Sequence, residues 1–305
     1  MRTKIIIFYL FFLPVTIFSQ DFTHISSGRL FYNTSFAGAS MEPRLSINYQ
    51  GQGMDNYAYG LGAVSYDQYI YQLRSGIGVY ISDIWLKDNF IGYNFSHVSY
   101  YGTFSPSINV AKKFMLKPSI YFGSNTDKYD SPAYSYQLPD PIEYKDIGGG
   151  LLVYSFDMYA GISFHNVNKA KVDSSSSPVE MILNFGGVIG KKDLGSKAIL
   201  LFPFLVYDEI SKYGEKLIKF GLDSRIHHLL LGVHVNSFGG NSINSDYMSA
   251  LIGFNVRNLR FAYSYDFVTS KSSASDNGKH EVSLTWLIKR KNNPTNIIPL
   301  PEMGF

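Results

Sequence analysis

The chain has 305 residues, a net formal charge of +3 and no cysteine. The lack of cysteine excludes a disulfide-based fold, thiolate metal sites, cysteine nucleophiles and a lipid-modified N-terminal cysteine. Acidic and basic residues nearly balance, so the overall charge points neither to a nucleic-acid partner nor to anionic lipid. Tyrosine, phenylalanine and glycine are abundant, with 24, 23 and 27 residues, and this usage favours strands and tight turns over helices.

The first residues have the organisation of a secretory signal peptide. Arg2 and Lys4 precede an apolar run at 5–13, and the small residue Ser19 marks the expected cleavage site. A membrane-spanning helix is the alternative, but such a helix needs about 20 apolar residues. We therefore predict a signal peptide at 1–19 and an exported mature chain that is periplasmic, secreted or embedded in an outer membrane.

Apolar and polar residues alternate in many segments between residues 43 and 289. In KLIKFGLD, for example, Lys219 and Asp223 fall on one face, and Phe220 and Leu222 fall on the other. This period of two is typical of strands with one apolar and one polar face. The pattern predicts fourteen strands, at 43–50, 57–66, 75–84, 95–110, 114–123, 147–156, 159–167, 179–189, 197–207, 215–225, 229–237, 246–256, 260–268 and 279–289.

The predicted connections alternate in length from the middle of the chain onward. A long polar loop at 124–146 precedes a two-residue turn at 157–158, and polar loops at 237–242 and 270–278 flank a short turn near residue 258. Short periplasmic turns and long external loops are typical of transmembrane β-barrels. A soluble β-sandwich is the alternative, but fourteen strands are many for a sandwich. We predict an all-β transmembrane antiparallel β-barrel of about 14 strands.

The segments that flank the predicted barrel at 43–289 show few alternations. Residues 20–42 form an N-terminal segment, which we expect within or beneath the barrel. Residues 290–305 contain three prolines, which cannot donate to a strand ladder. With an even number of strands both termini fall on the periplasmic side, so 290–305 is predicted to be a C-terminal periplasmic tail.

Four stretches in order resemble the PorP/SprF family of type IX secretion system outer-membrane proteins. The first, YNTSFAG at 32–38, is similar to a family signature near the mature N-terminus, although Thr34 stands where the family usually has proline. The others cover most of the remaining chain. They are GLGAVSYDQYI at 60–70 with SGIGVYISD at 75–83, LLVYSFDMYAGISFHNV at 151–167, and YSYDF at 263–267 with GKHEVSLTW at 278–286.

The resemblance implies a non-enzymatic barrel of fourteen strands in the outer membrane of a Gram-negative bacterium. It implies binding to the C-terminal sorting domain of a secreted cargo, such as a gliding adhesin, and a role in that cargo's export or surface retention. The implied further partners are the type IX translocon or periplasmic components, and outer-membrane lipid. The alternative is a diffusion pore or small-solute transporter. An open pore is expected to have charged inward faces, whereas the predicted inward faces carry few charges.

The predicted loop at 124–146 is the main candidate for binding a protein partner. Tyrosine provides a large contact area at a low entropic cost, and loops on a rigid scaffold suit recognition. A loop that plugs the lumen or is simply solvated is the alternative. The candidate partner-binding residues are Tyr129, Tyr134, Tyr136 and Tyr144.

No motif indicates a catalytic, cofactor or metal site. His227, His228, His234 and His280 are predicted to lie on different faces or rims, whereas zinc needs three or four converging ligands. A hydrolase formed by His280, Asp266 or Asp276 and a serine at 270–275 is a further alternative, although no nucleophile-elbow motif is present. The glycines at 148–150 indicate strand entry or close packing rather than a phosphate loop.

Overall fold

The computed structural model describes residues 22–53, 57–89, 92–130, 140–172, 175–190, 199–210, 215–238, 245–269, 278–289 and 298–301. Strands dominate this part of the chain, with a short helix α2 (Arg29–Tyr32) and a 3-10 turn η1 (Thr34–Phe36) near its beginning. The strands are β1 (Arg44–Gly53), β2 (Tyr57–Ile70), β3 (Ser75–Asp88), β4 (Tyr93–Pro106), β5 (Ile108–Ala111), β6 (Phe114–Asp130), β7 (Ile142–Tyr154), β8 (Met158–His165), β9 (Lys171–Val172), β10 (Ser175–Ser176), β11 (Glu180–Gly187), β12 (Ile199–Ile210), β13 (Glu215–Ile226), β14 (Leu229–Phe238), β15 (Ser245–Val256), β16 (Leu259–Val268) and β17 (Lys279–Leu287).

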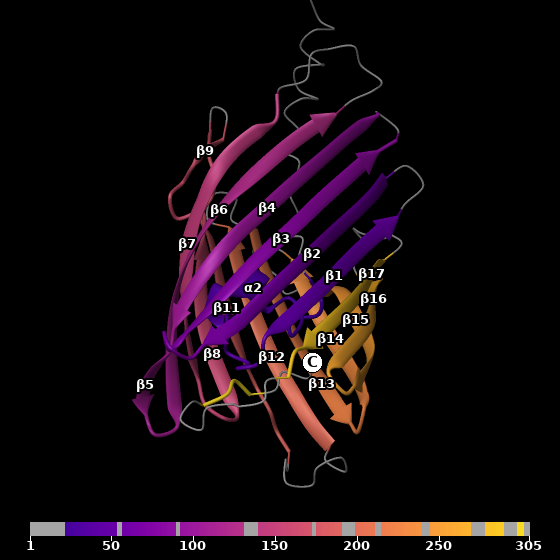
Figure 1. The fold of residues 1–305 in the computed structure, drawn as a ribbon. Helices are drawn as coiled ribbons and strands as arrows, with labels where there is room; N and C mark the ends of the chain where they lie inside the picture. Colours follow the sequence, from indigo (N-terminus) through magenta and orange to yellow (C-terminus); the bar gives the residue numbers. More distant parts are fainter. Residues whose placement is uncertain are drawn as a thin grey trace, which may run out of the picture.

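Fourteen of these strands form one closed antiparallel barrel (Figure 1). Each strand pairs with its neighbour along the chain, β1 pairs with β17, and the pairing of β4 with β6 is part of the same ring. The short strand β5 extends the β4–β6 hairpin, and β9 and β10 form a separate two-stranded sheet. Each of the fourteen predicted strands overlaps one strand of the barrel, so the predicted fold is confirmed.

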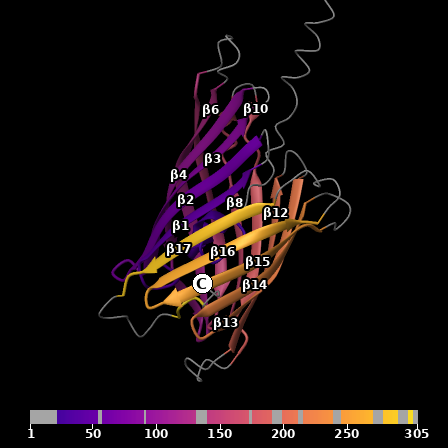
Figure 2. The same ribbon diagram turned by 90° about the vertical axis from the view of Figure 1, so that its right-hand side faces the viewer.

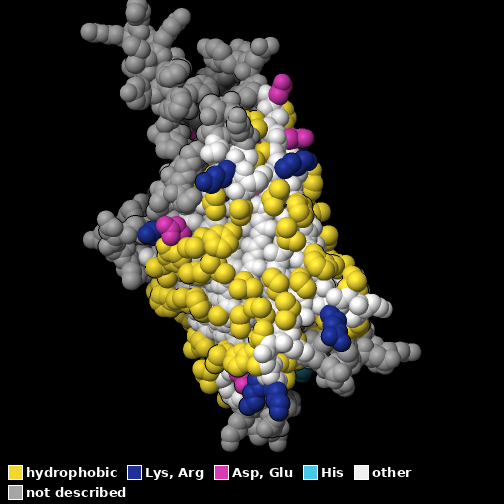
Figure 3. Space-filling model, turned by 90° about the vertical axis from the view of Figure 1, so that its left-hand side faces the viewer, with side chains coloured by type: hydrophobic (Ala, Val, Ile, Leu, Met, Phe, Trp, Pro, Cys, Tyr) yellow, Lys and Arg dark blue, Asp and Glu magenta, His cyan; other side chains and the backbone are white. Residues whose placement is uncertain are grey.

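The barrel has an apolar outer face, and its inner face carries polar and charged side chains, as the alternation predicts, together with buried apolar ones such as Leu61 and Leu152. Phe220 and Leu222 are 45% and 46% exposed, whereas Lys219 and Asp223 on the opposite face of β13 are buried. Exposed apolar side chains form a broad band around the visible side of the molecule (Figure 3). A band of this kind matches the hydrocarbon layer of a membrane, where every backbone N–H and C=O must find a partner within the protein.

Short turns gather at one end of the barrel. Residues 155–157, 227–228 and 257–258 connect strands at this end, where β1 begins and β17 ends. His227 and Arg257 adopt positive φ angles of 58° and 55°, as the first residue of a tight two-residue hairpin turn requires. The longer connections 131–141 and 166–179 lie at the opposite end, although the connection 188–198 at the short-turn end is also long.

The predicted loop boundaries at 124–146 were wrong. Residues 124–130 continue β6 and residues 142–146 begin β7, so the connection is limited to 131–141. Cross-strand pairing carries these polar residues into the sheet, because Asp127 pairs with His97 of β4 and with Ile142 of β7. We call strands β2, β3, β4, β6 and β7 the long-strand wall. It reaches further at the long-connection end than β12–β17 do (Figure 2).

Among the described residues, no helix has the length and apolarity required to cross a membrane.

We predict that Phe220→Arg destabilises the folded barrel in lipid bilayers by about 2–4 kcal/mol, because the charge would lie on the lipid-facing side of mid-strand β13. Phe267→Arg, one residue from the end of β16, is the matched control and should cost about 0–1 kcal/mol. Denaturant unfolding in vesicles measures both values. Equal losses for the two variants would contradict the assignment of the outer face to lipid.

Candidate functional site

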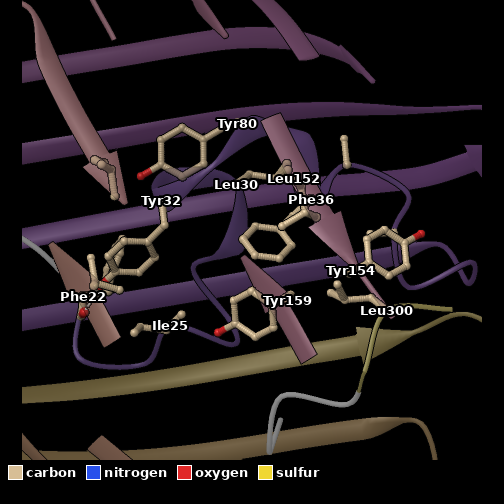
Figure 4. Close-up of a cluster of buried hydrophobic side chains, with 14 of the residues drawn as sticks. Phe22, Ile25, Leu30, Tyr32, Phe36, Tyr80, Leu152, Tyr154, Tyr159 and Leu300 are labelled. Atoms are coloured by element: carbon tan, nitrogen blue, oxygen red, sulfur yellow. Dashed lines mark hydrogen bonds between the residues drawn. The ribbon is translucent and has the colours of Figure 1, made fainter. Parts of the chain in front are cut away.

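The N-terminal segment occupies the barrel lumen. Residues 22–41, which we call the plug, are buried except for the partly exposed Phe31 and Ser40. Aromatic side chains of the plug pack against inward-facing wall residues (Figure 4). Phe36 lies edge-on to Tyr159 of β8 with ring centroids 5.6 Å apart, and Phe31 lies 6.1 Å from Tyr80 of β3. The plug therefore forms one apolar core with the wall.

Asn33 joins the centre of the plug to three neighbouring strands. Its amide group donates to the carbonyl oxygens of Leu151 and Ile162 and to Oδ1 of Asn184, over 3.5, 3.3 and 3.1 Å. A Cβ atom at Gly150 or Gly161 would lie only 2.6 Å from the Asn33 amide group. These wall glycines thus leave the space that Asn33 fills, which supports the close-packing interpretation of the glycines at 148–150.

Hydroxyl groups bind the 3-10 turn η1 of the plug to strand β6. Oγ1 of Thr34 and Oγ of Ser35 each lie 2.8 Å from Oγ of Ser119 on β6. Oδ1 of Asn33 accepts a hydrogen bond from the Ser35 backbone N–H over 2.9 Å and caps η1. Thr34 is the first residue of η1, a position that also suits proline. The departure from the family pattern at Thr34 is therefore compatible with the same local fold.

The end of the plug approaches the wall so closely that only glycine fits. Gly38 has a φ of 64°, and a Cβ at Gly76 of β3 would lie 1.7 Å from the carbonyl oxygen of Ala37. The Gly38 N–H donates to Oδ2 of Asp67 over 2.9 Å, and Nε of Arg44 donates to Oδ1 of the same carboxylate over 2.8 Å. The buried Arg44–Asp67 ion pair thereby anchors this end of the plug.

Charged wall residues hold the beginning of the plug. The backbone N–H groups of Thr23 and His24 donate to the carboxylate of Glu281 on β17. Nζ of Lys219 donates to the Phe22 carbonyl oxygen. The wall thus supplies both an acceptor and a donor to plug backbone groups. Several ionisable side chains face inward, among them Arg44, Asp67 and Lys219, so the prediction of few inward charges was wrong.

Burial also changes the pKa of a histidine in the plug. Removal from water lowers the pKa of His24 well below its ordinary value, and the nearby His234 and Lys219 lower it further. The imidazole is therefore neutral at neutral pH. Its Nδ1 lies 2.6 Å from Oγ of Ser283.

Residues from the far end of the chain pack on the plug. The N–H of Leu300 donates to the carbonyl oxygen of Ala39 over 3.0 Å, and Ile298 and Leu300 join the same apolar core. Part of the predicted C-terminal tail therefore contacts the plug, and the rest of that tail lies outside the described residues.

The long-strand wall carries two of the four candidate partner-binding residues. Tyr129 lies on β6 and Tyr144 on β7, both half-buried, while Tyr134 and Tyr136 lie outside the described residues. Tyr129 contacts Phe95 and Tyr93 of β4, with ring centroids 5.2 and 6.4 Å apart. The sequence reasoning missed Phe95, whose alternation with polar residues indicated only the strand at 95–110. It also missed Tyr93, which precedes that predicted strand.

A histidine–carboxylate pair lies next to this aromatic cluster. Nδ1 of His97 and Oδ1 of Asp127 are 2.5 Å apart, and Nε2 of His97 lies 2.8 Å from Oγ of Ser99. The His97 side chain is partly exposed, whereas Asp127 is largely buried. The aromatic side chains of the cluster therefore lie beside the hydrogen-bonded His97–Asp127 pair, and all of them are held on strands.

The described residues among those considered for catalysis or metal binding are not brought together. His280 is exposed and lies 2.7 Å from the Tyr263 hydroxyl, whereas Asp266 is buried in the lumen. Asp276 and the serines at 270–275 lie outside the described residues. His234 pairs with Asp223 inside the barrel over 2.7 Å. Within the described ranges no three histidine or acidic side chains are grouped to hold a metal ion.

We predict that Gly76→Ala displaces the plug and produces steady ion conductance in planar bilayers, because its Cβ would overlap the Ala37 carbonyl group. The wild-type barrel should show no steady open state. Gly62→Ala on β2 is the matched control, since a Cβ there meets no atom within 4 Å. A closed Gly76→Ala barrel would contradict the role of this contact.

Several solved structures of outer-membrane proteins are similar to this chain. The toluene transporter TbuX of Ralstonia pickettii has a TM-score of 0.52 at 8% identity, covering 87% of this chain and 94% of its own. A FadL homologue of Pseudomonas aeruginosa also has a TM-score of 0.52, at 11% identity, covering 87% of this chain and 96% of its own. CdiB from Acinetobacter baumannii gives a TM-score of 0.46 at 8% identity, covering 80% of this chain and 60% of its own.

The matches to TbuX and to the FadL homologue show an outer-membrane barrel fold. No curated protein sequence matches the chain significantly. The family model described as type IX secretion system membrane protein PorP/SprF matches residues 19–286, which include the plug and all but the last residue of β17. The chain therefore belongs to the PorP/SprF family of type IX secretion system membrane proteins and is located in a Gram-negative outer membrane.

Proposed function

We propose that this barrel binds the C-terminal sorting domain of a secreted cargo protein, such as an adhesin, and supports its export or surface retention. Membership of a secretion family supports a role in protein traffic. The observation that carries the proposal is the lumen filled by the chain's own plug. A barrel closed in this way is suited to presenting a surface rather than to conducting solutes.

The aromatic cluster of the long-strand wall is the proposed contact surface. Tyr93, Phe95 and Tyr129 combine large contact area with few rotatable bonds, which suits protein recognition. The cluster lies on strands rather than loops, so little entropy is lost when a partner binds. It also lies at the long-connection end, which faces outward in barrels of this class. Tyr144 belongs to the same wall.

The short-turn end is the proposed contact site for other components of the secretion system. It faces the periplasm in this class of barrel. Residues of the predicted tail are anchored to the plug there through the Leu300–Ala39 hydrogen bond. A periplasmic partner that pulled on the tail would therefore act directly on the plug.

A transporter for small solutes is the second candidate. The fold likeness to TbuX, whose name describes a toluene transporter, makes this alternative worth testing. The plug's hydrogen bonds to β1, β4, β6, β8, β13 and β17 oppose it, because a free path would require breaking several buried contacts. Steady conductance of the wild-type barrel would favour the transporter.

We predict that Tyr129→Ser lowers surface display of one type IX cargo while other cargos still leave the cell. Loss of an aromatic anchor at a protein interface costs about 2 kcal/mol, or roughly 30-fold in affinity. Surface labelling of cargo in intact cells and immunoblotting of the outer membrane measure this effect at equal barrel levels.

Lys128→Ser is the matched control, since Lys128 lies on the opposite face of the same strand and is exposed. It should leave display unchanged. Unchanged display of every cargo after complete deletion of the gene would overturn the proposed function.

A further inference from the structure

The short-turn rim carries an excess of exposed cations. Arg74, Lys112, Lys113, Arg257 and Lys289 are exposed there, whereas Asp157 is the exposed acid among the described residues of this rim. At the opposite end the exposed acids and bases among the described residues are equal in number. The acids are Asp83, Asp130, Asp140 and Glu143, and the bases are Lys87, Lys128, Lys145 and Lys169. Among the described residues, the excess of exposed positive charge is therefore confined to the short-turn rim.

Four of these cations have no acidic partner in the described part of the chain. Lys112, Lys113, Arg257 and Lys289 form none of the ion pairs found among the described side chains. The lumenal cations Arg44 and Lys219 are by contrast bound to a carboxylate or a carbonyl oxygen. The rim cations are thus available for anions from outside the chain.

The hairpin of β5 and β6 places two of the cations at its tip. Ile108 of β5 pairs with Leu116 of β6, and Lys112 and Lys113 form the turn between the strands. All four residues of β5 are exposed. The hairpin therefore extends the barrel wall beyond the end of the neighbouring strand β3, at the lower left of Figure 1.

The outer face of this hairpin continues the lipid-facing band. Phe114, Ile120 and Phe122 share one face of β6, because side chains alternate along a strand, and they are 42%, 46% and 59% exposed. Ile108 lies beside this face through its pairing with Leu116 and is 45% exposed. The apolar surface thus runs without interruption from the membrane band to the lysines, which places the lysines at the depth of the lipid headgroups.

Other rim cations repeat this arrangement. Leu73 precedes Arg74 and Val256 precedes Arg257, and both apolar side chains are 60% exposed. An exposed apolar residue beside a long cationic side chain is typical of a membrane interface, where the cation reaches the headgroup layer. In Figure 3, Lys and Arg side chains lie directly below the apolar band at this end.

We propose that the short-turn rim, and the β5–β6 hairpin above all, binds the phosphate headgroups of anionic glycerophospholipids in the adjoining leaflet. The apolar face enters the acyl region and the two lysines contact phosphate oxygens. This lipid site is independent of cargo binding at the opposite end and would fix the depth and tilt of the barrel.

Native mass spectrometry of the full-length protein tests the proposal, with equal amounts of phosphatidylglycerol and phosphatidylcholine offered in detergent. The wild-type protein should retain phosphatidylglycerol preferentially, and raising the salt concentration should weaken this preference. Lys112→Gln with Lys113→Gln should reduce the preference about fivefold per lysine, since each cation near an anionic surface contributes about that factor.

Lys128→Gln with Lys145→Gln is the matched control at the opposite end and should keep the wild-type preference. Both lysine pairs are exposed, so each double variant should keep the heat-modifiable mobility of a folded barrel. Equal retention of the two lipids by the wild-type protein would overturn the proposal, as would an equal loss in the control. A polyglutamate peptide that bound in phosphatidylcholine nanodiscs and was lost with Lys112 and Lys113 would instead indicate an acidic protein partner.

Discussion

The pairing of β4 with β6 completes the ring of hydrogen bonds, and the rest of the structure depends on that ring being closed. A sheet in lipid cannot leave an edge unpaired, because no water is present to satisfy its backbone groups. Closure fixes which side of every strand faces lipid and which faces the lumen. A ring of fourteen strands then encloses more space than its own inward side chains fill, and the plug occupies that space.

The plug is held by contacts of different chemistry at its two ends and its centre. Asn33 fits against Gly150 and Gly161, Gly38 fits against Gly76, and Glu281 holds the backbone of Thr23 and His24. Buried polar groups are costly unless they are paired, so these hydrogen bonds specify one position of the plug as much as they stabilise it. The stretch 32–38, which resembles the family signature, therefore packs against several wall glycines as one unit. Because the plug fills the lumen, the structure favours recognition of a partner at the barrel surface over passage of solutes.

The strand pattern was predictable, whereas the plug contacts were not. Alternation along KLIKFGLD is a local property, so the faces of Lys219 and Phe220 follow from the sequence. Glu281 lies 258 residues from Thr23 in the chain, and no local pattern indicates that they meet. The ends of β6 and β7 were missed because their polar residues resemble a loop, although pairing with β4 keeps residues such as Asp127 in the sheet. The aromatic cluster around Tyr129 depends on the same pairing of β4 with β6, so the local sequence does not predict it.

Disulfide trapping of the plug inside the closed wall tests the central claim most directly. The chain contains no cysteine, and Oγ of Ser35 lies 2.8 Å from Oγ of Ser119 on the inner face of β6. Ser35→Cys with Ser119→Cys should form a disulfide in intact outer membranes, seen as a mobility change that reductant reverses. Ser35→Cys paired with Ser96→Cys, on the outer face of β4, should not. A Ser35→Cys/Ser119→Cys barrel that stays reduced, with both thiols open to a membrane-impermeant maleimide, would contradict the account.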